Sequence, residues 1–267
     1  MKYGIVDSHV HLGTAGVPLG PRDPRDSFAL WTARAQAAGI RGAVLMAAPA
    51  GRYAAANRAV AEIASRTPGE WLWYVFINPA ADQGRVADIV AAAHRRRASG
   101  IKVHWSDGPA TDEVARVAAR HRMPVLFDPG GDIPRIAHLA ERHPAVPWIV
   151  PHLSSFADNW QAQKALIELL VRLPNVFTDT SGVRYFDLLV EAIARAGAHK
   201  VLYGSDGPYL HPAPELAKIQ ALGLPPNEQR LVLRGNILRL TRPAHDTVRS
   251  HDAATISPRH GHSPLRV

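Results

Sequence analysis

Eight short runs rich in β-branched and aromatic residues alternate along the chain with longer stretches rich in Ala, Arg and Glu. This alternation is typical of repeated β-α units, in which a helix returns the chain from each strand to the next parallel strand. Eight units within 267 residues favour a closed (β/α)8 barrel of the TIM type over an open α/β sheet. The predicted strands are residues 4–10, 42–47, 71–77, 100–104, 124–128, 148–152, 175–179 and 201–204.

The segments between the strands carry helix signals, which are clearest in two of them. Residues 111–121 open on a Thr-Asp pair that can cap a helix, and residues 159–173 carry apolar side chains at i, i+3, i+4 and i+7. Both end before a proline-led turn. A third, alanine-rich segment ends in three arginines at residues 95–97, where cations complement the carbonyl end of a helix.

Two segments fall outside the repeat. Residues 13–26 are rich in Gly and Pro. As the loop after the first strand they would lie at the carboxyl ends of the strands, either as a lid or as a passive surface loop. Residues 243–267 are polar and basic and lack apolar periodicity. We therefore expect one barrel domain over residues 1–242 and a disordered tail over residues 243–267.

Composition narrows the chemistry. Because the chain has no cysteine, disulfides, thiolate metal sites and cysteine nucleophiles are excluded, and any metal must be held by His, Asp or Glu. The formal charge is +8, but the basic residues are dispersed, so we expect no nucleic-acid partner. The sequence opens without a signal peptide, and no apolar run reaches the roughly 18 residues of a membrane span. We expect a soluble, cytoplasmic protein without a membrane partner.

The predicted strands end in polar side chains, and in such a barrel the reactive groups lie at the carboxyl ends of the strands. The first strand ends in DSHVH, residues 7–11. Because side chains alternate along a strand, His9 and His11 both point to the barrel axis, where two imidazoles can begin a divalent-metal site. His152 and Asp206, at the ends of the sixth and eighth strands, face the same axis. Agreement among positions so far apart in sequence predicts a metal centre.

At these positions the sequence resembles the amidohydrolase superfamily, and in particular amidohydrolase family 2. That branch includes lactonases, other hydrolases and decarboxylases of the aminocarboxymuconate-semialdehyde type. The resemblance spans residues 4–241 and depends on the order and spacing of seven motifs. These are DSHVHLG, GIKVH, PVLFDPG, IVPHLS, NVFTDTSG, LYGSDGPY and GNILRL.

The resemblance implies a metal-dependent barrel enzyme with one divalent ion, Zn²⁺ in the first place and Mn²⁺ as the alternative. His9 and His11 would bind the ion. Asp206 would be a ligand, a proton carrier or both. His152 would be a further ligand or the group that polarises the substrate.

One position departs from the family pattern. The fifth strand of the family normally ends in a metal-binding His, where this chain has Asp128. Asp128 can still ligate an ion, and a second carboxylate would make harder ions such as Mn²⁺ more competitive with Zn²⁺. Alternatively, Asp128 points at the substrate or pairs with Lys102.

Three functions remain open. The first is hydrolysis of a small organic acid, lactone or related carbonyl compound. In that reaction the ion generates hydroxide, Asp206 moves the proton of water to the leaving group, and His152 stabilises developing charge. The second is non-oxidative decarboxylation, which would use the same residues. The third, suggested by Asp128, is a barrel that has lost its metal and catalysis and only binds a small molecule.

Further side chains are placed to bind a small, anionic or aromatic substrate. Lys102 and His104 share a parity and should face inward, offering a cation and a neutral donor, unless Lys102 is a structural partner of a buried carboxylate. Another group lies just beyond strand ends, where it would suit a conjugated carboxylate or simply fill the loops. Its members are Trp105, Phe156, Arg184, Tyr185 and Tyr209.

Two more acids are expected to support the site rather than to react. Asp179, in the seventh strand, can orient a histidine or cap the following helix. Asp7 lies one layer deeper in the barrel than His9. A homo-oligomer is compatible with a barrel of this type, although the sequence shows no interface.

Overall fold

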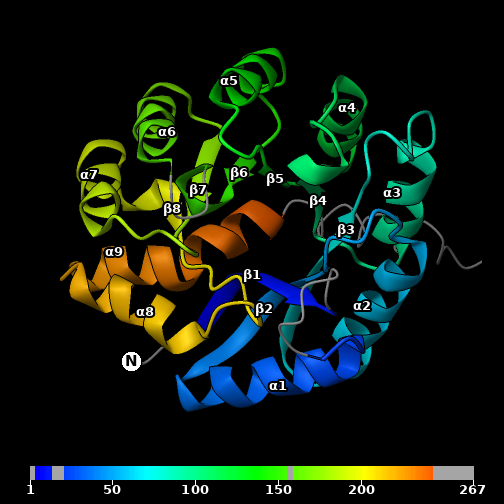
Figure 1. Ribbon diagram of the computed structural model, residues 1–267, viewed down its shortest axis with the longest axis horizontal. Helices are drawn as coiled ribbons and strands as arrows, with labels where there is room; N and C mark the ends of the chain where they lie inside the picture. The colour runs from blue at the N-terminus through cyan, green and yellow to red at the C-terminus, as the bar shows by residue number, and fades with distance from the viewer. Residues whose placement is uncertain (1–3, 14–20, 155–158, 243–267) are drawn as a thin grey trace, which may run out of the picture.

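Eight parallel strands follow one another around a single axis in the computed structural model, which describes residues 4–13, 21–154 and 159–242 (Figure 1). Each strand pairs with the next one along the chain. The strands are β1 (Ile5–Leu12), β2 (Ile40–Ala47), β3 (Glu70–Phe76), β4 (Gly100–His104), β5 (Val125–Asp128), β6 (Trp148–Val150), β7 (Val176–Asp179) and β8 (Val201–Leu202).

Backbone hydrogen bonds between the two ends of the sheet bring β8 and β1 together. The N–H of Ser8 donates to the carbonyl of Tyr203 at 2.9 Å, and the N–H of His11 donates to the carbonyl of Gly207 at 2.7 Å. Val10 and Gly207 form a parallel bridge. The predicted (β/α)8 barrel is therefore confirmed, with eight strands in the predicted order.

Helices follow the strands and cover the outside of the barrel (Figure 1). None of the described helices is long and apolar enough to cross a bilayer. The helices are α1 (Pro24–Ala37), α2 (Ala54–Arg66), α3 (Val86–Arg95), α4 (Asp112–His121), α5 (Ile133–Arg142), α6 (Trp160–Arg172), α7 (Phe186–Ala196), α8 (Pro212–Ala221) and α9 (Pro226–Arg230).

The two best-predicted helices begin at side-chain caps. Thr111 accepts a hydrogen bond from the N–H of Val114 at the start of α4, and Asn159 accepts one from the N–H of Ala162 at the start of α6. Each cap satisfies an amide that the helix itself leaves without a partner. The helix α3 ends at Arg95, so the arginine run lies at a helix carboxyl terminus, as predicted.

Two layers of apolar packing stabilise the barrel. One layer lies between the strands and the surrounding helices, and the other fills the barrel interior. In the interior, Ile237 and Leu240 from the last helical turns belong to one cluster with side chains from every strand except β4. They lie at the amino-terminal end of the barrel, where the neighbouring Asn236 donates to the carbonyls of Ala198 and Val201 at the start of β8. The interior cluster is Val6, Val44, Met46, Tyr74, Leu126, Ile149, Phe177, Leu202, Ile237 and Leu240.

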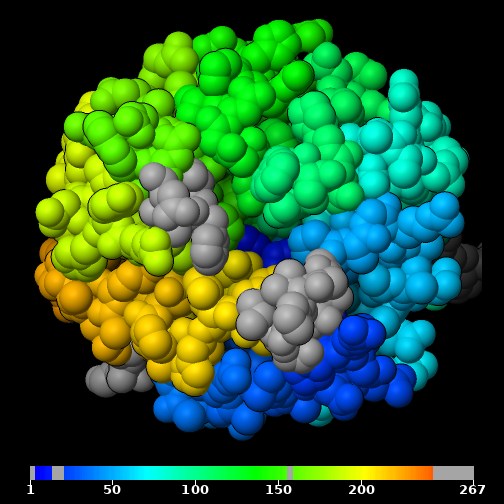
Figure 2. All heavy atoms as spheres, in the orientation of Figure 1, coloured from blue at the N-terminus to red at the C-terminus, as the bar shows by residue number. Residues whose placement is uncertain are grey.

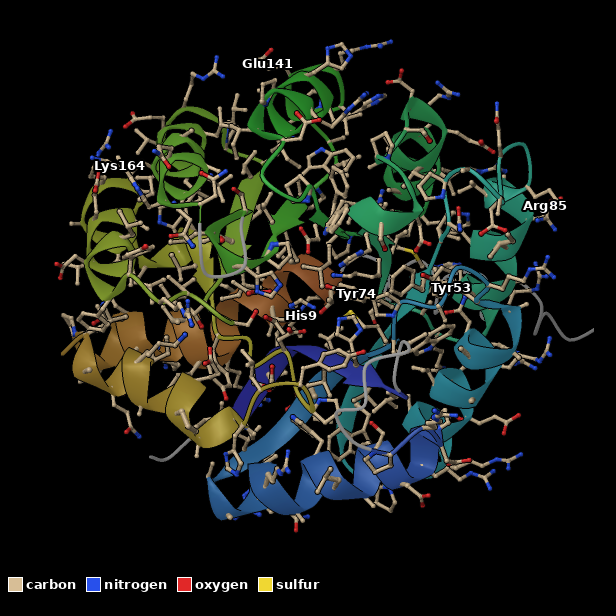
Figure 3. The ribbon with its side chains drawn as sticks, viewed as in Figure 1. His9, Tyr53, Tyr74, Arg85, Glu141 and Lys164 are labelled. Carbon is tan, nitrogen blue, oxygen red and sulfur yellow. The ribbon has the colours of Figure 1, made fainter. Side chains whose placement is uncertain are left out.

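The opposite end of the barrel is open. Figure 2 shows a hollow in the middle of this face, with the dark blue atoms of the first strand at its floor. In Figure 3, His9 on β1 and Tyr74 on β3 lie near the axis, whereas Arg85, Glu141 and Lys164 lie on the outer surface. The carboxyl ends of the strands therefore surround this hollow.

The observed strands differ from the predicted ones at their ends. The strand β6 stops at Val150 rather than at residue 152, because His152 and Leu153 have φ values of 60° and 51°, in the left-handed region that a strand does not visit. The strand β8 stops at Leu202, and β1 continues to Leu12. Residues 14–20 of the proposed lid, Phe156 and the tail over residues 243–267 lie outside the described residues.

Candidate metal centre and substrate site

Two histidine rings from β1 meet at the floor of the hollow. Nδ1 of His9 lies 2.9 Å from Oδ2 of Asp179, and Nδ1 of His11 lies 2.7 Å from the carbonyl oxygen of Ala47. Because an ionised carboxylate and a carbonyl can only accept, each Nδ1 donates, and in the neutral rings the lone pairs are on Nε2. The two Nε2 atoms lie 3.0 Å apart. Two lone pairs at this distance suit a shared cation.

Asp206 completes a group of three potential ligands. Its Oδ1 lies 3.5 Å from Nε2 of both His9 and His11. The ligand atoms of these three buried residues all lie within 4.8 Å of one another. Two imidazole nitrogens and a carboxylate oxygen match a catalytic zinc set that leaves a coordination position open. The residues present therefore fit a divalent metal.

His152 lies on the other side of His9, with the two ring centroids 5.3 Å apart. Its Nδ1 lies 2.8 Å from the carbonyl oxygen of Ser181 and 2.9 Å from the Ser181 hydroxyl. The carbonyl bond assigns the N–H to Nδ1 and the lone pair of the neutral ring to Nε2. His9, His152 and Asp179 form a second group with ligand atoms within 4.8 Å of one another.

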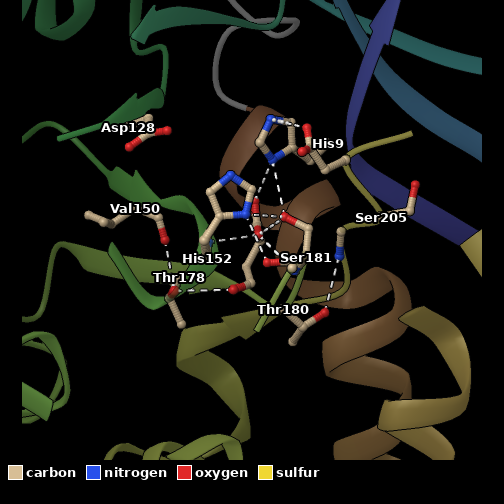
Figure 4. A network of polar contacts seen from close by, with 12 residues as sticks. His9, Asp128, Val150, His152, Thr178, Thr180, Ser181 and Ser205 are labelled. Carbon is tan, nitrogen blue, oxygen red and sulfur yellow. Dashed lines mark hydrogen bonds and ion pairs between the residues drawn. The ribbon is translucent and has the colours of Figure 1, made fainter. Parts of the chain in front are cut away.

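Asp179 holds both histidines in place, as expected of a supporting carboxylate. Its Oδ2 pairs with the His9 ring, while its Oδ1 accepts from the Ser181 hydroxyl at 2.6 Å and from the backbone N–H groups of Ser181 at 3.0 Å and His152 at 3.3 Å. Burial alone would raise the pKa of Asp179, but His9, His152 and the Ser181 hydroxyl hold it below its ordinary value. The hydrogen bonds joining these residues are drawn in Figure 4.

Left-handed backbone positions cluster at the ends of β6 and β8. His152, Leu153, Ser154 and Asp206 have φ values of 60°, 51°, 83° and 54°. Non-glycine residues adopt such values at a conformational cost, and strained positions of this kind cluster at functional sites. Nearby, a Cβ on Gly204 would lie 3.1 Å from the Cβ of His9, so glycine permits the close approach of this segment to β1.

Burial shifts the pKa values of the acid and the bases at this site in opposite directions. Burial raises the pKa of Asp206, against the charges of His9, His152 and Lys102, which lower it. Burial also lowers the pKa of His9 and, more strongly, that of His11, which favours the neutral form of both rings. Neutral imidazoles are the form that binds metal.

Lys102 brings a buried cation to the edge of the metal site. It is 1% exposed, and its Nζ lies 3.5 Å from Nε2 of His9. Burial lowers the pKa of Lys102, whereas Asp128, Asp206 and Asp179 act in the opposite direction. The predicted inward orientation of this side chain is therefore confirmed.

Asp128 lies on the Lys102 side of the site, outside both groups of potential ligands found among the described residues. Its Oδ1 accepts from the N–H of Gly130 at 2.9 Å, and its Oδ2 lies 3.5 Å from Nε2 of His104. Burial and the charge of Lys102 lower the pKa of His104 to about 4. Figure 4 shows Asp128 apart from the bonded network of His9 and His152.

The predicted substrate-binding side chains divide into two sets. Tyr209 packs near His11 with ring centroids 5.6 Å apart, and Trp105 stacks beside His104 at 5.7 Å. Arg184 and Tyr185 are exposed just before α7. The sequence analysis did not identify Ser181, whose hydroxyl contacts Asp179, His9 and His152. Its place in the TDTSG motif was a usable signal.

A family model covers nearly all of the described barrel. The model of amidohydrolase family 2 matches residues 6–242. A search of curated proteins finds no match.

Solved structures share the fold at low sequence identity. An amidohydrolase from Burkholderia multivorans is similar with a TM-score of 0.74 and 18% identity, covering 90% of this chain and 99% of that one. The complex of 2,6-dihydroxybenzoate decarboxylase with 2,6-dihydroxybenzoate gives a TM-score of 0.70 at 16% identity, over 90% and 99% of the two chains. A protein described as a 2-pyrone-4,6-dicarboxylic acid hydrolase from Pseudomonas putida has a TM-score of 0.70 and 15% sequence identity, covering 91% of this chain and 99% of that one.

Proposed function

The chain belongs to amidohydrolase family 2, as its strand-end motifs predict, and on this premise we propose a metal-dependent hydrolase of a small organic acid, lactone or related carbonyl compound. The observation that carries the proposal is the pair of Nε2 atoms on His9 and His11, 3.0 Å apart and each 3.5 Å from Asp206. The similar barrel described as a 2-pyrone-4,6-dicarboxylic acid hydrolase supports it.

We assign the metal to His9, His11 and Asp206, with His152 as a further ligand or substrate contact. The two nitrogens and one carboxylate favour Zn²⁺, and Mn²⁺ is the alternative if a second carboxylate joins the set. A divalent ion bound there supplies Lewis acidity, which makes water more acidic and polarises a carbonyl group.

Asp206 is the residue proposed to move the proton. Burial raises the pKa of this carboxyl, which brings it closer to the range in which a group can both accept and return a proton. His152 is proposed to act on the substrate through Nε2, because its Nδ1 is held by Ser181. Protonated at Nε2, it can donate a hydrogen bond to an oxygen that develops negative charge.

Lys102 and His104 are proposed to bind an anionic group of the substrate. Lys102 offers a cation that is almost wholly buried, so its attraction for a carboxylate is little weakened by solvent. Around them, aromatic and cationic side chains are proposed to contact the rest of a small, anionic or aromatic substrate. They are Trp105, Arg184, Tyr185 and Tyr209.

Decarboxylation is the second candidate. The specific observation in its favour is the position of the buried Asp206 carboxyl, 3.5 Å from Nε2 of both His9 and His11, where it could carry the proton that replaces carbon dioxide. The barrel of 2,6-dihydroxybenzoate decarboxylase is similar in fold.

The experiment begins with untagged protein prepared without chelator or nickel, loaded with Zn²⁺ or Mn²⁺ and freed of excess ion. About one equivalent per chain by elemental analysis supports the metal site. The loaded protein is then offered pyrones and other lactones, with acid release as the readout, and hydroxybenzoates, with carbon dioxide as the readout. In Asp206→Asn, turnover should fall about 10²- to 10⁴-fold. If wild-type protein retains no ion and turns over neither set, a non-catalytic binding barrel is the better hypothesis.

The substitution Asp128→His tests the role of Asp128. We propose that Asp128 faces the substrate beside His104, and we then expect the zinc affinity of Asp128→His to stay within about threefold of wild type. A gain of about tenfold or more would instead make residue 128 a ligand position, since imidazole binds Zn²⁺ well. Competition with a chromophoric chelator measures this affinity, with Asp132→Asn, in the loop before α5, as the control.

A further inference from the structure

A cavity of about 590 Å³ lies away from the metal site, on the amino-terminal side of the barrel. Arg122 lies three residues before the start of β5 and forms one wall, and the end of α9 with the chain that follows it forms the other. Five of the eight lining residues are arginines, and the other three are Leu231, Gly235 and Leu238. No carboxylate lines this cavity in the part of the chain that the structure describes.

Two of the five guanidinium groups are fixed by the fold. Arg234 donates to both carboxylate oxygens of Glu70 at 2.5 and 2.8 Å and to the carbonyl of Gly4 at 3.3 Å. Arg239 lies over the ring of Phe177, 5.4 Å from its centroid, and donates to the carbonyl of His199 at 3.1 Å. These contacts restrain both side chains, which line the cavity.

The other three arginines bring charge that no acid of the described residues pairs with. Arg122, Arg230 and Arg242 are exposed, and within residues 4–13, 21–154 and 159–242 their side chains have no ion pair with an acid. Like charges gathered in one concave space repel one another, and an anion with several charges would relieve that repulsion. A guanidinium group offers paired N–H donors that match the oxygens of phosphate and carboxylate.

We propose that this cavity binds a small polyanion carrying two or more phosphate or carboxylate groups, at a site separate from the catalytic centre. The volume lies within the usual range for small-molecule sites. The absence of a lining carboxylate distinguishes it from the arginine-rich cavity near α2 and α3, which Glu62 also lines. The polyanion proposal does not depend on the proposed reaction.

The test is calorimetric titration of the full-length, metal-loaded protein with tripolyphosphate and, separately, with tricarballylate. Arg122→Asn/Arg230→Gln removes two of the uncompensated charges, and Asn suits the left-handed backbone of residue 122, where φ is 52°. The matched control, Arg58→Gln/Arg116→Gln, changes the net charge equally at exposed positions on α2 and α4. If an anion removes the metal, the heat of that removal should be the same in both variants, because none of the substituted arginines contacts the metal site.

We expect at least one anion to bind wild type and the control with similar affinity, and to bind the cavity variant at least tenfold more weakly. The preferred anion then tells whether phosphate or carboxylate is recognised. Arg242→Gln, at the end of the helical turns that follow α9, provides a milder variant that should weaken binding in the same direction. Equal weakening in the cavity variant and the control, or binding of neither anion, overturns the proposal. So does binding of a short oligonucleotide alone.

Discussion

At the scale of single residues, the metal centre depends on which nitrogen each imidazole presents. The parity of His9 and His11 could be predicted from the sequence, because alternation along a strand is local. Their hydrogen-bond acceptors could not, since pairing of β1 with β2 places the carbonyl of Ala47 2.7 Å from His11, and closure of the barrel brings Asp179 of β7 within 2.9 Å of His9. The left-handed φ of His152 could not be predicted either, because it depends on contacts with residues far from it in sequence.

Asp179→Asn tests the positioning of His9. Asparagine is nearly the same size as aspartate, but it lacks the charge that keeps the N–H on Nδ1 and strengthens the basicity of Nε2. We expect the affinity for Zn²⁺ to fall about 10- to 100-fold, measured by competition with a chromophoric chelator. Asp187→Asn, at an exposed position on α7, is the matched control and should bind Zn²⁺ like wild type. An unchanged affinity in Asp179→Asn would mean that His9 is oriented by other contacts.

At the scale of elements, a buried carboxylate links β1 to the segment after β8. Oδ1 of Asp7 accepts from the N–H of His9 at 3.1 Å and from the N–H of Ser205 at 2.9 Å. This link sets the position of Asp206, the next residue, relative to the two histidines of β1. Oδ2 of Asp7 is buried without a hydrogen-bond partner in the described part of the chain. Burial accordingly raises the pKa of Asp7 to about 7.

Asp7 should make the stability of the metal-free protein fall as the pH rises. Between its unfolded pKa of 3.8 and its folded pKa of about 7, the folded state holds a proton that the unfolded state has released. Raising the pH therefore favours unfolding, and from pH 5 to pH 8 this group should lower the free energy of unfolding by about 3 kcal/mol. Asp7→Asn should lose this dependence in urea titrations at the two pH values.

The control for this experiment is Asp88→Asn, at an exposed position on α3, which should keep the wild-type dependence. A difference between pH 5 and pH 8 that is the same in wild type and in Asp7→Asn would assign the pH dependence to other groups.

The elements themselves were predictable to different extents. Strand number and order followed from the alternation of apolar runs, and the helices α4 and α6 followed from caps and periodicity that lie within each segment. Strand ends were less predictable, because β6 and β8 stop where the backbone turns toward the site rather than where the β-forming residues end. The side of the site on which Asp128 lies also depends on tertiary packing, since its neighbour His104 belongs to another strand.

At the scale of the whole molecule, the two ends of the barrel differ. The carboxyl ends of the strands surround the hollow of Figure 2, whereas Ile237 and Leu240 fill the amino-terminal end. This asymmetry leaves His9 near the axis at the open end, from which the proposed substrate would approach. It also makes the final helical turns part of the barrel core, although they follow the last strand by more than thirty residues.

Ile237→Ala tests whether these final turns hold the barrel together. Ile237 is 1% exposed and contributes to the interior cluster, so truncation removes buried methyl groups and leaves a cavity. We expect the free energy of unfolding in urea to fall by about 2–5 kcal/mol. Val190→Ala, at a position that is 44% exposed on α7, should change it by less than about 0.5 kcal/mol. Zinc affinity should be the same in both variants, because the ligands lie at the other end of the barrel. A small loss in Ile237→Ala would show that the strands form a stable core without this closure.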